Sequence, residues 1–82
     1  MIIMQLLRNT DDIVEYEYFI EGNENPGYRG IVFYDKLNSE VGYEEAQEEP
    51  KPLNWYWGHA LIKLEEFVEK NEFPEKKLVA WY

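Results

Sequence analysis

His59 is the only histidine in this sequence and the first residue that could do acid–base chemistry. Glu66 follows seven positions later, which is about two turns of a helix, and Lys63 lies one turn from His59. A histidine beside a carboxylate can act as a general acid or base. One hypothesis is therefore a small enzyme that uses His59 with Glu66. The alternative is a solvated helix face, on which charge pairs one turn apart are common and weak.

Other reactive groups are sparse. The chain has no cysteine, which excludes thiol nucleophiles, disulfides and thiolate metal sites. Besides tyrosine, the only hydroxyl residues are Thr10 and Ser39, and neither has a base at a recognisable spacing. Gly27 and Gly30 fall in a predicted hairpin and do not precede a helix, so they do not form a nucleotide-binding loop. The sequence predicts no catalytic residues, no metal site and no cofactor, and it favours a non-enzymatic protein.

Acidic side chains dominate the charge, with 17 acidic and 8 basic residues and a net charge of −9. This balance argues against direct binding to nucleic acid or to an anionic membrane surface, since both depend on clustered Lys and Arg. An acidic surface would instead attract a protein with a basic surface. The alternative is that these glutamates only keep the protein soluble and unaggregated. The candidate acidic surface consists of Glu15, Glu17, Glu21, Glu44, Glu45, Glu48 and Glu49.

Aromatic side chains offer a second candidate surface at the start of a predicted helix. Trp55 and Tyr56 lie beside its apolar stripe, where they would be partly exposed, and Tyr and Trp are enriched at binding hot spots. The alternative is that both rings fold over the end of the sheet and pack with Trp81 or Tyr82.

The elements that would position these residues follow from periodicity. Residues 13–20 alternate between apolar and mostly acidic side chains, the pattern of a half-buried antiparallel strand. The turn formers over 22–27 predict a hairpin to a strand over 28–35. The expected pairs are Glu21 with Tyr28, Phe19 with Gly30, Tyr18 with Ile31 and Tyr16 with Phe33. In this register Gly30 leaves space for the Phe19 ring.

Three further strands are expected. Residues 1–8 lack the features of a signal peptide and are interpreted as a first strand. Residues 40–46 predict a short strand in which Val41 and Tyr43 point inward, and a charged loop over 44–52 follows. Residues 78–82 predict the last strand.

The best-defined element is a helix from Trp55 to Lys70, with Asn54 as its N-cap. Its apolar stripe consists of Trp57, Ala60, Leu61, Leu64, Phe67 and Val68. The opposite, solvent side consists of His59, Lys63, Glu66 and Lys70. Asn71 suits the left-handed position after the helix, and Pro74 prevents its continuation.

Together these elements predict a single α+β domain over residues 1–82. The expected architecture is a small antiparallel sheet of four to five strands, in the order β-β-β-β-α-β, with the helix packed on one face. No apolar run approaches the roughly 20 residues needed to span a bilayer, which favours a soluble, cytoplasmic protein.

Three functional hypotheses follow. The leading one is a non-enzymatic binding or interaction module, with homodimerisation through a sheet edge or exposed aromatic residues as one form of it. The second is an acidic inhibitor that mimics the charge of nucleic acid and blocks a basic protein. The third is the small enzyme using His59 and Glu66.

Overall fold

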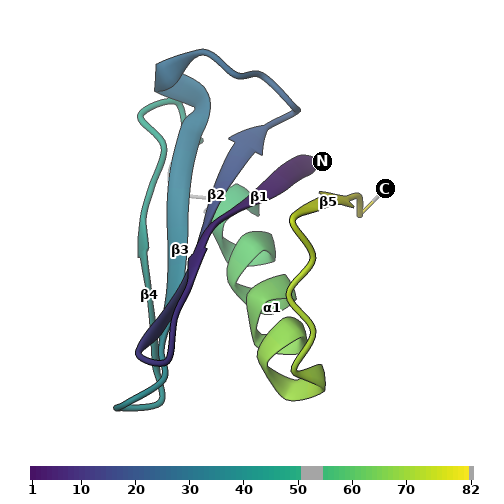
Figure 1. The fold of residues 1–82 in the computed structure, drawn as a ribbon. Coiled ribbons are helices and arrows are strands. Elements are labelled where there is room, and N and C mark those ends of the chain that lie inside the picture. Colours follow the sequence, from purple (N-terminus) through teal and green to yellow (C-terminus); the bar gives the residue numbers. More distant parts are fainter. Residues whose placement is uncertain (51–54, 82) are drawn as a thin grey trace.

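The computed structural model describes residues 1–50 and 55–81, and it confirms the predicted α+β architecture. A five-stranded antiparallel sheet in the order β4-β3-β2-β1-β5 packs one helix on one face (Figure 1). The elements are β1 (Ile2–Asn9), β2 (Ile13–Ile20), the 3₁₀ helix η1 (Pro26–Tyr28), β3 (Arg29–Asp35), β4 (Glu40–Glu44), α1 (Trp55–Lys70) and β5 (Lys76–Val79).

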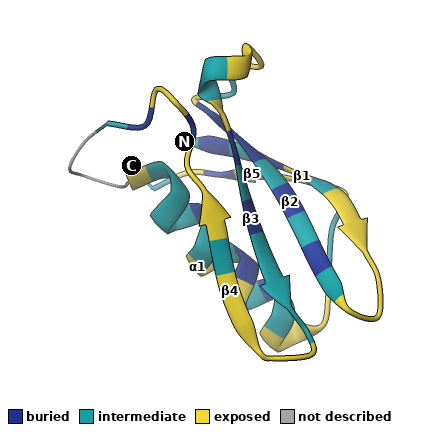
Figure 2. Cartoon of the chain, turned by 90° about the vertical axis from the view of Figure 1, so that its left-hand side faces the viewer, coloured by how far each residue is buried: buried dark blue, intermediate teal, exposed yellow. Residues whose placement is uncertain are grey.

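The alternating strand β2 lies at the centre of the sheet and supplies much of the core. Its inward-facing Val14, Tyr16 and Tyr18 are completely buried, as the period-two pattern predicts. Phe19 faces the other side of the sheet and is nevertheless buried. Figure 2 shows that buried residues concentrate on β2 and on the side of α1 that faces the sheet, while the hairpin tips are exposed.

The predicted register between β2 and β3 is wrong by one residue. Tyr18 pairs with Gly30, Phe19 with Arg29 and Tyr16 with Val32. The physical reason is the size of the Tyr18 ring, which lies directly over Gly30, so a Cβ atom at that position would overlap it. Gly30 therefore accommodates Tyr18 and not Phe19.

The β2–β3 connection explains how this register arises. Glu21 and Gly22 have positive φ angles of 49° and 73°, and the Asn23 amide donates to the Ile20 carbonyl at 2.9 Å, which turns the chain tightly after β2. The 3₁₀ helix η1 then takes up Tyr28, so Tyr28 does not pair with Glu21 and β3 begins at Arg29.

Strands β4 and β5 form the two edges of the sheet. β4 ends at Glu44, two residues before its predicted end, because the chain turns so that Ala46 enters the core. The sequence predicts the last strand over 78–82, but β5 spans Lys76–Val79 and pairs with Ile2–Gln5 of β1. Tyr82 lies outside the described residues.

The helix α1 has the predicted bounds and the predicted apolar stripe, of which Ala60, Leu64 and Phe67 are buried. The expected N-cap, Asn54, lies outside the described residues. At the other end Asn71 has a φ of 53°, and the Glu72 amide donates to the Phe67 carbonyl at 3.1 Å. This is a Schellman-type end with the predicted left-handed residue. Over the described residues, no helix is both long enough and apolar enough to cross a membrane.

Candidate binding surfaces

The glutamates on the outer side of the sheet are paired with cations. Glu15 Oε1 lies 3.5 Å from Arg8 Nε, and Glu17 forms a hydrogen-bonded ion pair with the Arg29 guanidinium. The pairs follow from the strand registers, which set Arg8 opposite Glu15 on β1, and Arg29 diagonal to Glu17 on β3. The charge of these two glutamates is therefore largely compensated within the sheet.

Glu21 belongs to a different part of the molecule from Glu15 and Glu17. Its Oε2 accepts hydrogen bonds from the Met1 amine at 2.7 Å and from the Tyr56 hydroxyl at 3.2 Å. The structure thus joins two of the sequence-predicted candidates, Glu21 and Tyr56, at the end of the sheet where α1 begins.

Glu49 is buried, with 4% of its surface exposed, and works as a structural residue. Its Oε2 accepts from the Tyr56 amide at 2.9 Å, while its Oε1 accepts from the Trp57 amide at 3.2 Å and the Tyr18 hydroxyl at 2.7 Å. A carboxylate at this place satisfies free amides of the first helical turn and complements the helix dipole. Glu49 is therefore not part of an open acidic surface.

The remaining acidic candidates, Glu44, Glu45 and Glu48, are exposed where β4 ends and the following loop begins. The seven glutamates of the predicted acidic surface therefore occupy several environments: two pair within the sheet, one bonds at the start of α1, one is buried and three are exposed.

The two aromatic candidates differ from each other. Trp55 is 53% exposed, as the surface interpretation expects. Tyr56 packs edge-on against Trp81, with 5.7 Å between ring centroids, as the packing alternative expects. Trp81 also stacks on His59, with centroids 4.0 Å apart and an interplanar angle of 7°.

His59 and Glu66 have separate partners. His59 lies against Trp81, so it does not occupy an open solvent face as expected, and Glu66 accepts a hydrogen bond from Lys63 at 2.7 Å. This bond and the Lys63 charge hold the pKa of Glu66 below its ordinary value. The geometry gives no direct support to an acid–base pair. Among the described residues, no group of three or more His, Cys, Asp or Glu side chains could hold a metal ion.

A further surface, apolar and separate from the acidic candidates, lies along β4 and the solvent side of α1. We call it the β4–α1 face; its exposed large apolar residues are Val41, Tyr43, Trp55 and Ile62. The Tyr43 ring stacks on Trp57 with centroids 3.9 Å apart. Tyr43 points to the helix side of the sheet, as the sequence predicts, because it pairs with the buried Val32. It is nevertheless 45% exposed, since β4 is an edge strand with only one neighbouring strand.

A second such surface is a cleft of about 670 Å³ between α1, the segment that follows it and β5. We call it the lysine cleft; it is lined by Lys63, Glu66, Phe67, Lys70, Glu72, Phe73, Pro74, Lys76 and Lys77. Sequence reasoning missed it because it depends on how β5 packs beside the helix. The available signal was the concentration of four lysines in the last 20 residues of the chain.

Comparisons of this chain with known protein families, with curated proteins and with solved structures find no match.

Proposed function

We propose that this protein is a non-enzymatic interaction module that binds a basic, partly apolar segment of a partner protein on the β4–α1 face. The observation on which the proposal depends is the set of apolar side chains exposed along one edge strand and the adjacent helix. Trp55 and Ile62 are 53% and 59% exposed and lie two turns apart on the same side of α1. Gly58 lies between them in the helix, and the space around its Cβ position is open. No side chain of the described residues therefore covers the helix surface between Trp55 and Ile62.

The charge around this face favours a basic segment. Glu40 and Glu44 at the two ends of β4 point to the other side of the strand from Val41 and Tyr43, so the charge on this face comes from α1. Its Glu65 and Glu69 help to line a groove of about 320 Å³ between β4 and α1. Acidic residues around an apolar centre match the usual anatomy of a binding surface, with its polar rim. As an edge strand, β4 could also pair with an extended segment through its backbone.

The test is a selection from a random peptide library displayed on phage, followed by affinity measurements on the enriched peptides. We expect peptides with Lys or Arg interspersed with apolar residues, and affinities that fall as salt is raised. The variant Ile62→Ser should weaken binding at least about fivefold, because an exposed apolar contact at the centre of the face is lost.

Leu78→Ser provides the matched control, since Leu78 is 60% exposed but lies on β5 at the other edge of the sheet. It should leave the affinities unchanged. Equal losses in the two variants, or enriched peptides without basic residues, would argue against the β4–α1 face.

The partner on the β4–α1 face could also be a second copy of this chain, which would form a homodimer through the β4 edge. Sedimentation equilibrium distinguishes it: a concentration-dependent dimer that Ile62→Ser weakens identifies the second copy as the occupant, while a monomer at all concentrations leaves the basic segment as the proposed occupant.

An acidic inhibitor of a basic protein is a second candidate, favoured by the net charge of −9. The pairing of Glu15 and Glu17 with arginines reduces the charge that the outer side of the sheet could present. This function requires binding to a basic nucleic-acid-binding protein that weakens steeply between low and high salt. Binding that is independent of salt would contradict it. Both proposals retain the cytoplasmic location that the sequence predicts.

A further inference from the structure

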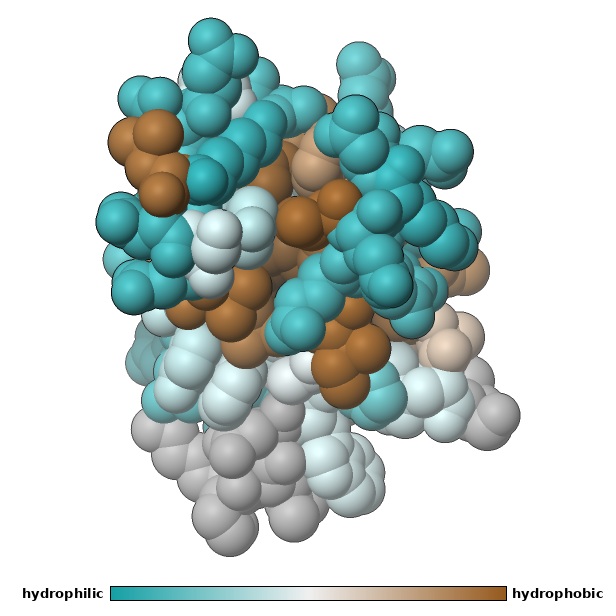
Figure 3. All heavy atoms as spheres, turned by 90° about the horizontal axis from the view of Figure 1, so that it is seen from below, coloured by the Kyte–Doolittle hydropathy of each residue, from teal (hydrophilic) through white to brown (hydrophobic). Residues whose placement is uncertain are grey.

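The lysine cleft reverses the charge of the rest of the molecule. Four of the chain's eight basic residues line it, together with only two glutamates, although the whole chain has a net charge of −9. Its apolar lining consists of Phe67, Phe73 and Pro74. Figure 3 shows one end of the molecule. Hydrophobic residues gather at the centre of this view, with hydrophilic residues on both sides. The cleft thus combines an excess of positive charge with an apolar floor.

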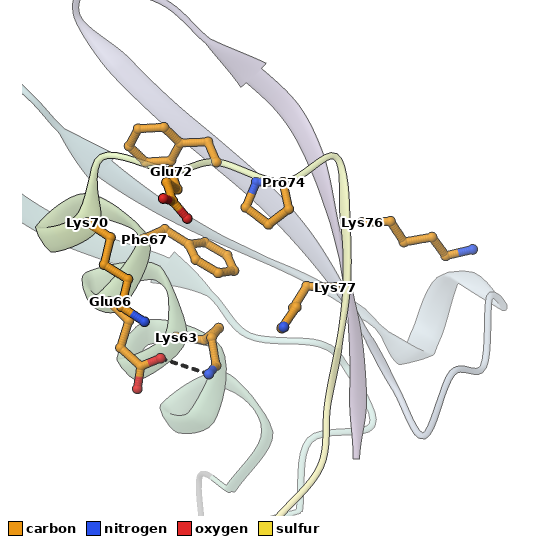
Figure 4. A pocket seen from close by; sticks show the side chains of 9 residues that line it. Lys63, Glu66, Phe67, Lys70, Glu72, Pro74, Lys76 and Lys77 are labelled. Carbon is orange, nitrogen blue, oxygen red and sulfur yellow. Dashed lines mark hydrogen bonds and ion pairs between the residues drawn. The ribbon is translucent and has the colours of Figure 1, made fainter.

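Three of the lysines are placed around one carboxylate. Lys63 Nζ donates to Glu66 Oε2 at 2.7 Å, and the charges of Lys70 and Lys77 also help to hold the pKa of Glu66 low. Figure 4 shows Lys77 directed from β5 toward the helix, whereas the side chain of Lys76, at the edge of the cleft, extends to the other side of the strand. The register explains the difference, because Lys77 pairs with the inward-facing Met4 and Lys76 with the exposed Gln5. Glu72 also lines the cleft, so these three ammonium groups exceed the two carboxylates by one positive charge, which an external anion can neutralise.

The walls of the cleft are fixed by hydrogen bonds to the core. The Tyr16 hydroxyl donates to the Pro74 carbonyl at 2.6 Å, and the Leu6 amide donates to the Glu75 carbonyl at 2.8 Å. The Schellman-type end of α1 fixes the chain between Phe67 and Glu72. The backbone of the cleft therefore needs little reordering when a ligand binds.

We infer that the lysine cleft binds a small organic anion with an apolar body, such as an aryl or alkyl phosphate or carboxylate. The anionic group would lie near Lys63, Lys70 and Lys77, and the apolar body would lie against Phe67, Phe73 and Pro74. The cleft volume of about 670 Å³ falls within the range of small-molecule sites. This function is independent of the β4–α1 face, which lies on the other flank of α1.

The test uses phenyl phosphate as the probe, with inorganic phosphate and benzyl alcohol as single-feature comparisons, in an NMR titration of the backbone amides. We expect saturable shifts at the amides of Phe67, Lys70, Phe73 and Lys77 with phenyl phosphate. Each comparison compound lacks either the apolar body or the charge, so both should bind at least about threefold more weakly.

The neighbouring lysines of β5 provide a matched pair of variants. Lys77→Gln should weaken phenyl phosphate binding about threefold or more, while Lys76→Gln removes the same charge one residue away and should have a smaller effect. Shifts scattered over the whole molecule, an absence of saturation, or equal losses in both variants would overturn the inference. The amide spectrum of each variant without ligand shows whether it remains folded.

Discussion

At the scale of single residues, two glycines differ sharply in what surrounds them. A Cβ atom at Gly30 would overlap the completely buried Tyr18 ring, whereas a Cβ atom at Gly58 in α1 has open space around it. We expect Gly30→Ala to lower the free energy of unfolding by about 1–3 kcal/mol, the usual range for overpacking. Gly58→Ala should raise it by about 0.5–1 kcal/mol, since alanine favours the helix. Urea unfolding of both variants checks the pair, and equal changes would contradict the packing of Tyr18 over Gly30.

The buried tyrosines of β2 predict a loss of stability at alkaline pH. Burial raises the pKa of Tyr16 to about 12, and burial followed by the nearby Glu49 raises the pKa of Tyr18 further. In the unfolded chain both hydroxyls titrate near 10, so above about pH 10 the folded protein holds protons that the unfolded chain has lost. The free energy of unfolding should therefore fall as the pH rises from about 10 to about 12.

Denaturant unfolding at a series of alkaline pH values, with tyrosinate absorbance recorded in parallel, measures this dependence. Tyr16→Phe should lower stability at neutral pH by about 1 kcal/mol through loss of the bond to the Pro74 carbonyl. The same variant should show a shallower alkaline decline. An unchanged slope in this variant would show that Tyr16 does not retain its proton in the folded state.

At the scale of elements, Glu49 connects the loop after β4 to the sheet and the helix. Its carboxylate accepts hydrogen bonds from Tyr18 of β2 and from two amides at the start of α1. Glu49→Gln keeps the shape of the side chain but removes its charge. It also places the side-chain NH₂ group, a hydrogen-bond donor, against the hydroxyl and amides that donate to Glu49. We expect a loss of about 1–3 kcal/mol in the free energy of unfolding.

Glu48→Gln is the control for this change, because Glu48 is adjacent and exposed. It should alter stability by less than about 0.5 kcal/mol. Similar losses in the two variants, measured by thermal unfolding, would mean that the Glu49 effect comes from net charge and not from its hydrogen bonds.

Elements with strong periodicity could be predicted from the sequence. The bounds of β2 and α1 and the left-handed Asn71 agree with prediction, because each depends on residues close together in the chain. The register of β3 could not be predicted, since it depends on the contact between the Tyr18 ring on β2 and Gly30 on the neighbouring strand β3. The end of β4 and the start of β5 were missed for a related reason, as both depend on contacts with the core.

The candidate surfaces were less predictable than the fold. The sequence indicates Trp55 and Tyr56 as aromatic candidates, but it could not show that Tyr56 meets Trp81, which lies far along the chain. The sequence predicts Glu49 as a surface residue, because nothing local marks it as a helix cap. The lysine cleft joins residues of α1 and β5 that come together only once the sheet forms.

At the scale of the whole molecule, the net charge of −9 sets a further expectation. Repulsion among the excess carboxylates destabilises the compact state, and salt screens it. Raising NaCl from about 20 to about 300 mM should therefore raise the melting temperature at neutral pH. Near the isoelectric point of about 4.4 the effect should vanish. A melting temperature that falls with salt at neutral pH would mean that the ion pairs of Glu15, Glu17 and Glu66 outweigh the repulsion.

Because β1 lies between β2 and β5, one backbone edge of β1 stays uncovered during synthesis until β5 is made. Of the strands that the structure describes, β1 leaves the ribosome first and β5 last. At roughly 5–20 residues per second, β5 follows β1 after about 4–15 s. Until then the backbone edge of Ile2–Gln5, flanked by the apolar side chains of Ile2, Ile3 and Met4, has no strand beside it. For those seconds a neighbouring nascent chain on the same messenger RNA could take the place of β5, so the rate of translation should affect the yield of monomer.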